Sequence, residues 1–301
     1  MAIPNFDDLP MVKGMPNGCA WGVFDKEGKK DMLGTLNLLT PDIVASAATE
    51  IKEGVSISLN WPLNGIKIPL PGRRSPAHKV MSLSSSGMMP PGSHGWDDEL
   101  EFNTQFSSQW DSLVHVQHQP SGLAYNGIKP TQENLHSRGG LVGRGVLIDF
   151  KEYMESQSKP YHYFDGYRIT IEDVEKVARH QANLSAEDLD KMKAAKLSGL
   201  HGTSDTAKWI WDKHFSAVAG DSQSFEAYPP IKPDGTEGGP QDLVLHQYLL
   251  SLFGMPIGEL WDLKALSSYC KKTSRYSFML TSAPLNHPGL IASPPNALAI
   301  F

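Results

Sequence analysis

The stretch Gln105-Phe-Ser-Ser-Gln109-Trp-Asp111-Ser-Leu-Val-His115 guides the interpretation of the whole chain. It begins within a run, residues 99–106, whose composition predicts a strand. Residues two apart on a strand point to the same face, so we expect Gln105, Gln109 and Asp111 to share one face, with His115 after a turn. Polar side chains gathered on one face are costly in a core unless they bind something. The stretch is therefore the first candidate for an active site.

The length and composition favour an ordinary globular protein. The 301 residues are enough to bury a core, and because no repeat or linker divides them we predict one domain over 1–301, with a loop-rich N-terminal arm at 1–40. The formal net charge of −6 and the lack of a basic block predict no nucleic-acid partner. Cys19 and Cys270 are expected to be free thiols.

Two further absences bear on where the protein works. No apolar run approaches the roughly 20 residues that a membrane helix needs, which predicts no membrane partner. The first residues carry acids and prolines instead of the basic and apolar segments of a signal peptide. We therefore expect a cytoplasmic protein.

Helix and strand signals alternate along the chain and predict an α/β fold. Thr40 followed by Pro41 is typical of a helix start. The short apolar run at 145–150 predicts a buried strand. Residues 276–281 are expected to form the last strand of the chain. A capping box of Ser and Asp predicts a further helix within 185–195.

Three more polar clusters lie outside the opening stretch. Asp221 follows a predicted strand, His246 lies on an amphipathic helix, and Glu259 comes just after a turn. Asp, His and Glu are residue types that hold divalent cations or exchange protons. A single histidine on a helix is more often structural, so the spacing alone does not establish a metal site.

The chain resembles the metal-dependent cyclase family, which includes bacterial kynurenine formamidase and isatin hydrolase. The motifs that carry the resemblance are Gly34-Thr-Leu-Asn37, Gly143-Arg-Gly-Val-Leu-Ile-Asp149, Ala219-Gly-Asp221-Ser222, His246-Gln-Tyr-Leu-Leu250, Gly258-Glu-Leu260, Ala283-Pro-Leu285 and Ser293-Pro-Pro-Asn296. The family signature His-x-Gly-Thr-His-x-Asp-x-Pro-x-His aligns with residues 105–115 on Asp111 and His115. The resemblance implies a swivelling β/β/α fold, usually oligomeric, so that a homodimer or homotetramer is expected.

The resemblance also implies a metal site. Asp111, His246 and Glu259 would be the ligands of a divalent cation, Mn or Zn, and His115 would be the acid/base or the ligand of a second metal. Gln105 and Gln109 stand where the family has its two leading histidines. An amide oxygen is a poorer ligand for zinc than imidazole but suits a harder ion such as manganese, so Gln109 is a fourth candidate ligand and Gln105 a candidate substrate-binding residue.

Two other features distinguish this chain. The family usually has a strand of the form Gly-Asp-x-Leu-x-x-Arg-x-Gly near positions 181–185, and the sequence predicts that this strand is missing here. Trp110 and Trp21 are candidates for stacking on a planar substrate, although aromatic residues are more often part of a core.

Three functional hypotheses follow, each with a small-molecule partner. The leading one is a hydrolase of a cyclic or aryl amide, or of a lactone, in which a cation activates water and His115 moves the proton. The second is a metal-free cyclase or isomerase of a small secondary metabolite, in which Asp111 and His115 form an acid/base pair while the glutamines orient a carbonyl. The third is a non-catalytic binding protein, for which the missing strand is the main argument.

Overall fold

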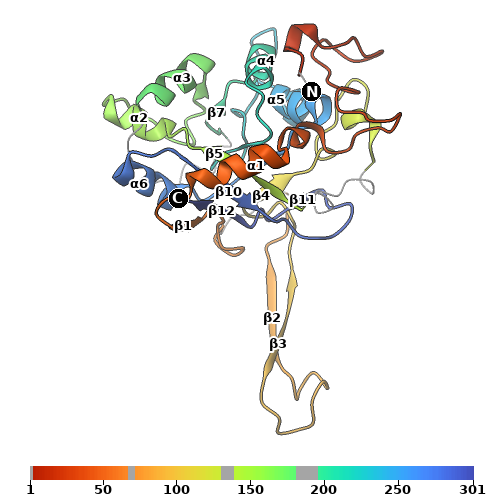
Figure 1. Ribbon diagram of the computed structural model, residues 1–301. Helices are drawn as coiled ribbons and strands as arrows, with labels where there is room; N and C mark the ends of the chain where they lie inside the picture. Colours follow the sequence, from red (N-terminus) through yellow and green to blue (C-terminus); the bar gives the residue numbers. More distant parts are fainter. Residues whose placement is uncertain (1–2, 67–71, 130–138, 181–195) are drawn as a thin grey trace.

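The computed structural model shows a mixed α/β body from which one long hairpin projects (Figure 1). The structure describes residues 3–66, 72–129, 139–180 and 196–301. The helix predicted within 185–195 and the strand predicted to be missing near 181–185 lie outside these ranges.

The first sheet joins a strand near residue 57 to the last strand of the chain. Its four antiparallel strands lie in the order β1 (Ser56–Ser58), β12 (Ala297–Ile300), β10 (Ser277–Ser282) and β5 (Leu141–Val146). The prediction that β10 is the last strand is wrong, because β12 pairs on its far side. The signal of β12 was weak: it is four residues long and its buried side chains are alanines.

The strand predicted over 145–150 is misplaced. β5 ends at Val146, and helix α2 (Phe150–Ser156) begins with Asp149 as its N-cap, whose side chain accepts a hydrogen bond from Glu152 N at 3.2 Å. Phe150 and Met154 pack in a small apolar cluster with Val177. A short apolar run does not by itself distinguish a strand from the first turn of a buried helix.

The second sheet carries the candidate site. Its order is β11 (Ala292–Ser293), β4 (Gln109–Asp111), β9 (Ile257–Glu259) and β8 (Val218–Ala219). β4 pairs with β9 antiparallel, whereas β8 pairs with β9 parallel. Every residue of β4 and β9 is buried.

Besides α2, the helices are α1 (Pro41–Ala47), α3 (Ile171–His180), α4 (Ser204–Asp212), α5 (Val244–His246), the π-helix η8 (Gln247–Phe253) and α6 (Lys264–Thr273). In Figure 1, α3, α4 and α5 lie on the side of the sheets away from the projecting hairpin. The predicted start of α1 is confirmed, since Thr40 Oγ1 accepts a hydrogen bond from Ile43 N. Among the described residues, none of the helices combines the length and the apolar character that crossing a bilayer requires.

Smaller elements connect these parts. Two short parallel strands, β6 (Arg168–Ile169) and β7 (Gly199–Leu200), pair beside the body. The short 3-10 helices are η1 (Phe6–Asp8), η2 (Gly34–Leu38), η3 (Ala48–Glu50), η4 (Tyr125–Gly127) and η7 (Pro240–Asp242).

The projecting hairpin consists of β2 (Ala77–Ser82) and β3 (Trp96–Glu101). The register places Val80, Trp96 and Leu100 on one face of this ribbon, and all three are exposed.

The strand predicted over 99–106 ends early, at Glu101. Asn103 makes the turn that ends it, since its side chain accepts a hydrogen bond from Gln105 N and its carbonyl accepts one from Phe106 N. Contrary to the prediction, Gln105 does not lie on the same strand as Gln109. It reaches the site from a loop.

Candidate active site

The pairing of β4 with β9 brings the first polar side chains together. Gln109 lies directly opposite Glu259 in the register, and Gln109 Nε2 donates a hydrogen bond to Glu259 Oε2 at 3.0 Å. Asp111 is two residues from Gln109 and so points to the same face of the sheet. All three side chains are buried. The sequence prediction that Gln109 and Asp111 share a face is confirmed.

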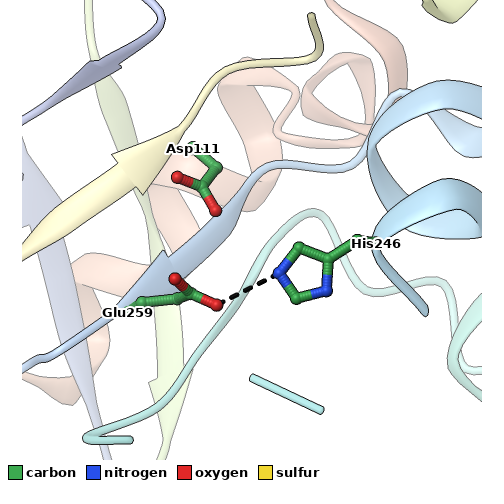
Figure 2. Close-up of side chains that lie close together, drawn as sticks. All are labelled: Asp111, His246 and Glu259. Carbon is green, nitrogen blue, oxygen red and sulfur yellow. Dashed lines mark hydrogen bonds and ion pairs between the residues drawn. The ribbon is translucent and has the colours of Figure 1, made fainter. Parts of the chain in front are cut away.

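His246 approaches this face from the end of α5. Its Nε2 lies 3.1 Å from Glu259 Oε1, and donor atoms of Asp111, His246 and Glu259 lie within 4.8 Å of one another (Figure 2). Three residues from three separate elements thus converge in the way that ligands of one cation do. Carboxylate and imidazole are the donors that zinc and manganese accept.

Two buried oxygen atoms at this site have no hydrogen-bond partner among the described residues. They are Asp111 Oδ2 and Gln109 Oε1. Leaving a buried acceptor unsatisfied costs about 1–3 kcal/mol, which a bound cation would offset. The donor set and these two open oxygens therefore fit a divalent metal ion.

The carboxylates of the site differ in their affinity for protons. Burial, reinforced by the nearby charge of Glu259, raises the pKa of Asp111 well above its ordinary value. Burial also acts to raise the pKa of Glu259, but the hydrogen bond and charge of His246 outweigh it and the net shift is downward. Asp111 therefore has a higher proton affinity than an ordinary aspartate, whereas Glu259 has a lower proton affinity than an ordinary glutamate.

His115 lies at the edge of the site after the turn that ends β4. Its Nε2 is 4.0 Å from Asp111 Oδ1, and its side chain is 24% exposed. Burial lowers the pKa of His115 to about 4, against the opposing charge of Glu259. The ring is thus neutral near pH 7, and the lowered pKa makes it a weaker base than a free imidazole. Its role as an acid/base stays a prediction.

The family model described as putative cyclase matches residues 57–227, more than half of the chain. The chain belongs to the putative cyclase family. This confirms the resemblance on which the sequence analysis rested. No curated protein matches the chain.

Solved structures support the same fold for this family member. A structure described as a novel cyclase has a TM-score of 0.73 and 26% sequence identity, and the match covers 94% of this chain and 99% of that one. Isatin hydrolase A from Ralstonia solanacearum matches at TM-score 0.53 and 13% identity, over 91% of this chain and 99% of that one. An isatin hydrolase bound to the product analogue thioisatinate matches at TM-score 0.53 and 15% identity, over 84% and 93%. The cyclase-type α/β fold is therefore confirmed.

In this family member Gln105 is held at both ends. Arg73 Nη2 donates to Gln105 Oε1 at 2.5 Å and Arg73 Nη1 donates to its main-chain oxygen at 2.6 Å, while Gln105 Nε2 donates to Asp111 Oδ1 at 2.8 Å. Gln105 thus directs a donor at one oxygen of Asp111 and leaves Oδ2 open. Sequence reasoning missed Arg73, whose guanidinium lies near the charges of Asp111 and Glu259.

Glu226 is a second residue that the sequence analysis missed. It is fully buried and its Oε1 lies 2.8 Å from His246 Nδ1. The only available signal was an acid five residues after Asp221 in a polar loop. Asp221 itself is not part of the converging group; its Oδ2 accepts a hydrogen bond from Tyr163 Oη at 2.5 Å.

The two candidate stacking residues differ in their surroundings. Trp110 points to the opposite face of β4, where it packs in the core edge-to-face against Trp261 with ring centroids 4.8 Å apart, and its indole donates to Ser282. Side chains alternate between the two faces of a strand. Because Gln109 and Asp111 face the site, Trp110 between them faces the core. Trp21 packs beside the cluster that contains Leu113 and donates to Ser251 O at 2.7 Å. Trp110 thus faces away from the converging ligands. Stacking of Trp21 on a substrate stays a prediction.

Proposed function

We propose that this protein is a hydrolase of a small cyclic or aryl amide, or of a lactone, that requires a divalent cation, Mn²⁺ or Zn²⁺. The observation that supports it best is the convergence of Asp111, His246 and Glu259 beside two buried oxygens that have no partner. The fold shared with the isatin hydrolases agrees with such chemistry. Its partner would be a small molecule, as the sequence analysis expects.

A cation held by these ligands would polarise a substrate carbonyl and make water a stronger nucleophile. The chain supplies the rest. His115 lies at the edge of the site with Nε2 4.0 Å from Asp111 Oδ1, where it would accept the proton of an attacking water and return it to the leaving group. Gln105 holds one oxygen of Asp111, which fixes the orientation of that carboxylate. The burial of Asp111 and Glu259 strengthens every charge interaction in the site.

The test combines metal analysis with activity on the full chain. We expect the purified protein to hold Mn²⁺ or Zn²⁺ in near-stoichiometric amount, to lose hydrolysis of an aryl formamide, a cyclic amide or an aromatic lactone on chelation, and to recover it with either ion. Asp111→Asn should weaken metal binding by more than about 100-fold, since even an outer-sphere change costs 10–100-fold. Asp221→Asn is the control, a partly buried aspartate outside the converging group whose carboxylate accepts a hydrogen bond from Tyr163.

The other hypotheses give different results in the same experiment. Activity that survives complete chelation and is lost in Asp111→Asn would favour a metal-free cyclase or isomerase. A protein that holds no metal, and that no metal activates, contradicts the proposal. Ligand binding that is unchanged in Asp111→Ala, without turnover, would point to a non-catalytic binding protein.

A further inference from the structure

Among the described residues, the carboxylate of Glu226 has three hydrogen-bond contacts, and all of them are with α5. Its Oε1 accepts from His246 N at 2.8 Å and lies 2.8 Å from His246 Nδ1, and its Oε2 accepts from Val244 N at 3.0 Å. One carboxylate, twenty residues away in the sequence, therefore holds both the main chain and the ring of His246. The position of the ring is set from the side that faces away from Glu259.

The contact at Nδ1 determines which nitrogen is available to a ligand. A ring that donates its Nδ1 hydrogen to a carboxylate presents Nε2 as the basic atom. In this structure Nε2 lies 3.1 Å from Glu259 Oε1 and is the nitrogen that faces Asp111 and Glu259. Figure 2 shows this edge of the ring turned toward Glu259.

Capping of α5 accounts for two of the three hydrogen bonds of this carboxylate. The two main-chain N–H groups bind different oxygens of Glu226, so a glutamine would keep only one of these two bonds. Glu226 is 0% exposed, and among the described residues its ion-pair partner is His246. Burying a carboxylate is costly unless it is paired, so its charge must serve the histidine.

The surrounding chain leaves room for this carboxylate. A Cβ at Gly202 would lie 2.2 Å from Glu226 Oε2, and a Cβ at Gly199 would lie 2.7 Å from the Glu226 main-chain carbon. Two glycines thus border Glu226, and an alanine at 202 would displace the carboxylate without removing it.

We propose that Glu226 is a positioning residue that fixes the tautomer and orientation of His246, so that Nε2 is ready to bind a cation. This rests on the proposed metal site and extends it by a carboxylate–histidine–metal relay. Carboxylates that hold ligand histidines in this way typically contribute 10–100-fold to metal affinity.

The test measures metal affinity, which does not depend on knowing the substrate. Competition with a chromophoric chelator gives the Kd for Zn²⁺ and Mn²⁺ of the wild-type chain and of Glu226→Gln. We expect the variant to bind about 10–100-fold more weakly. Glu152→Gln is the matched control, because Glu152 is also a buried glutamate but lies on α2, and its Kd should equal that of the wild type.

Gly202→Ala provides a second variant, and it keeps the charge. It should weaken metal binding in the same direction by displacing the carboxylate, and it carries the test if Glu226→Gln does not fold. If Glu226→Gln folds and binds metal with wild-type affinity, the inference is wrong. If only Gly202→Ala folds, wild-type affinity in that variant has the same meaning. Neither outcome contradicts the proposed hydrolase. A wild-type chain that binds neither ion overturns the metal site itself, and with it the relay.

Discussion

Arg73 and Arg74 are neighbours in the sequence with very different surroundings. Arg73 is partly buried and contacts Gln105 twice, whereas the side chain of Arg74 is 86% exposed and pairs with Glu101 at 3.1 Å. A surface pair of this kind contributes little. Comparing a substitution of Arg73 with the same substitution of Arg74 therefore distinguishes a role in the site from the general effect of losing one positive charge.

We expect Arg73→Ala to lower kcat/KM roughly 10- to 100-fold, because charge-assisted hydrogen bonds contribute about 1.5–3 kcal/mol and Gln105 would lose its hold on Asp111. Steady-state kinetics on the best substrate of the panel measure this. Arg74→Ala should stay within twofold of the wild type. Equal losses in the two variants would contradict a specific role for Arg73.

Asp221 gives the stability of the protein a pH dependence of known sign. Burial raises its pKa, against the hydrogen bond from Tyr163, so the folded state binds this proton more tightly than the unfolded chain does. The resulting stabilisation is complete below the unfolded pKa and is lost as the pH rises through the raised folded pKa. Asp221→Asn should therefore become more stable relative to the wild type as the pH rises above about 4, the ordinary pKa of an aspartate.

Urea unfolding followed by tryptophan fluorescence at several pH values measures this difference. Asp234→Asn is the control of opposite sign, since hydrogen bonds from Thr236 lower the pKa of the exposed Asp234. A stability difference between Asp221→Asn and the wild type that does not change with pH would refute the prediction.

At the scale of elements, α1 and the α5–η8 segment behave differently. α1 begins where local signals predict, at Thr40 and Pro41, and packs against β5. The segment predicted to be helical around His246 is a three-residue α-helix that continues as a π-helix of seven residues, which Gly254 ends with φ +68°. π-helical turns are frequent at functional sites. The backbone is thus regular where it only packs, and it becomes irregular directly after His246.

Thr40→Ala should lower the free energy of unfolding by about 1 kcal/mol, the usual contribution of an N-cap side chain. Thr40→Ser keeps the acceptor and should remain within a few tenths of a kcal/mol of the wild type. Urea unfolding of the three proteins checks this. If alanine and serine are equivalent, the cap makes no contribution.

At the scale of the whole molecule, the N-terminal segment is joined to the end of the π-helix through two glycines. Gly34 and Gly254 both have positive φ, and a Cβ at Gly34 would lie 1.9 Å from Gly254 O. Thr35 N donates to the same oxygen at 3.0 Å, and Thr35 Oγ1 donates to Ser216 O at 2.8 Å. This crossing connects the start of the chain to the element that follows His246.

Gly34→Ala should destabilise the protein by about 2–5 kcal/mol, since a left-handed alanine costs about 1–2 kcal/mol and overpacking adds about 1–3 kcal/mol. Gly28→Ala isolates the backbone cost, because Gly28 has φ +72° but no atom within 4 Å of an added Cβ. Thermal and urea unfolding compare the two. Equal losses would mean that the close approach at Gly254 can relax.

The homodimer or homotetramer, the cytoplasmic location and the absence of a nucleic-acid or membrane partner stay predictions.

Sequence patterns of different strength explain why some elements were predicted and others were not. The Thr-Pro start of α1 is a local signal that no tertiary contact opposes. The short β12 and the Asn103 turn had no comparable signal, because pairing across the sheet and a side-chain hydrogen bond decided them.

The sequence by itself determined the fold family, and its resemblance to that family's motifs named Asp111, His246 and Glu259 as ligand candidates. Only the tertiary structure decided how the ligands are held. Arg73 and Glu226 lie 32 and 20 residues from the groups they contact, and their effect depends on distances and burial that no local pattern encodes. The two amides of the opening stretch likewise differ by their neighbours: Gln105 is bound at both ends, whereas Gln109 keeps one oxygen open beside the carboxylates.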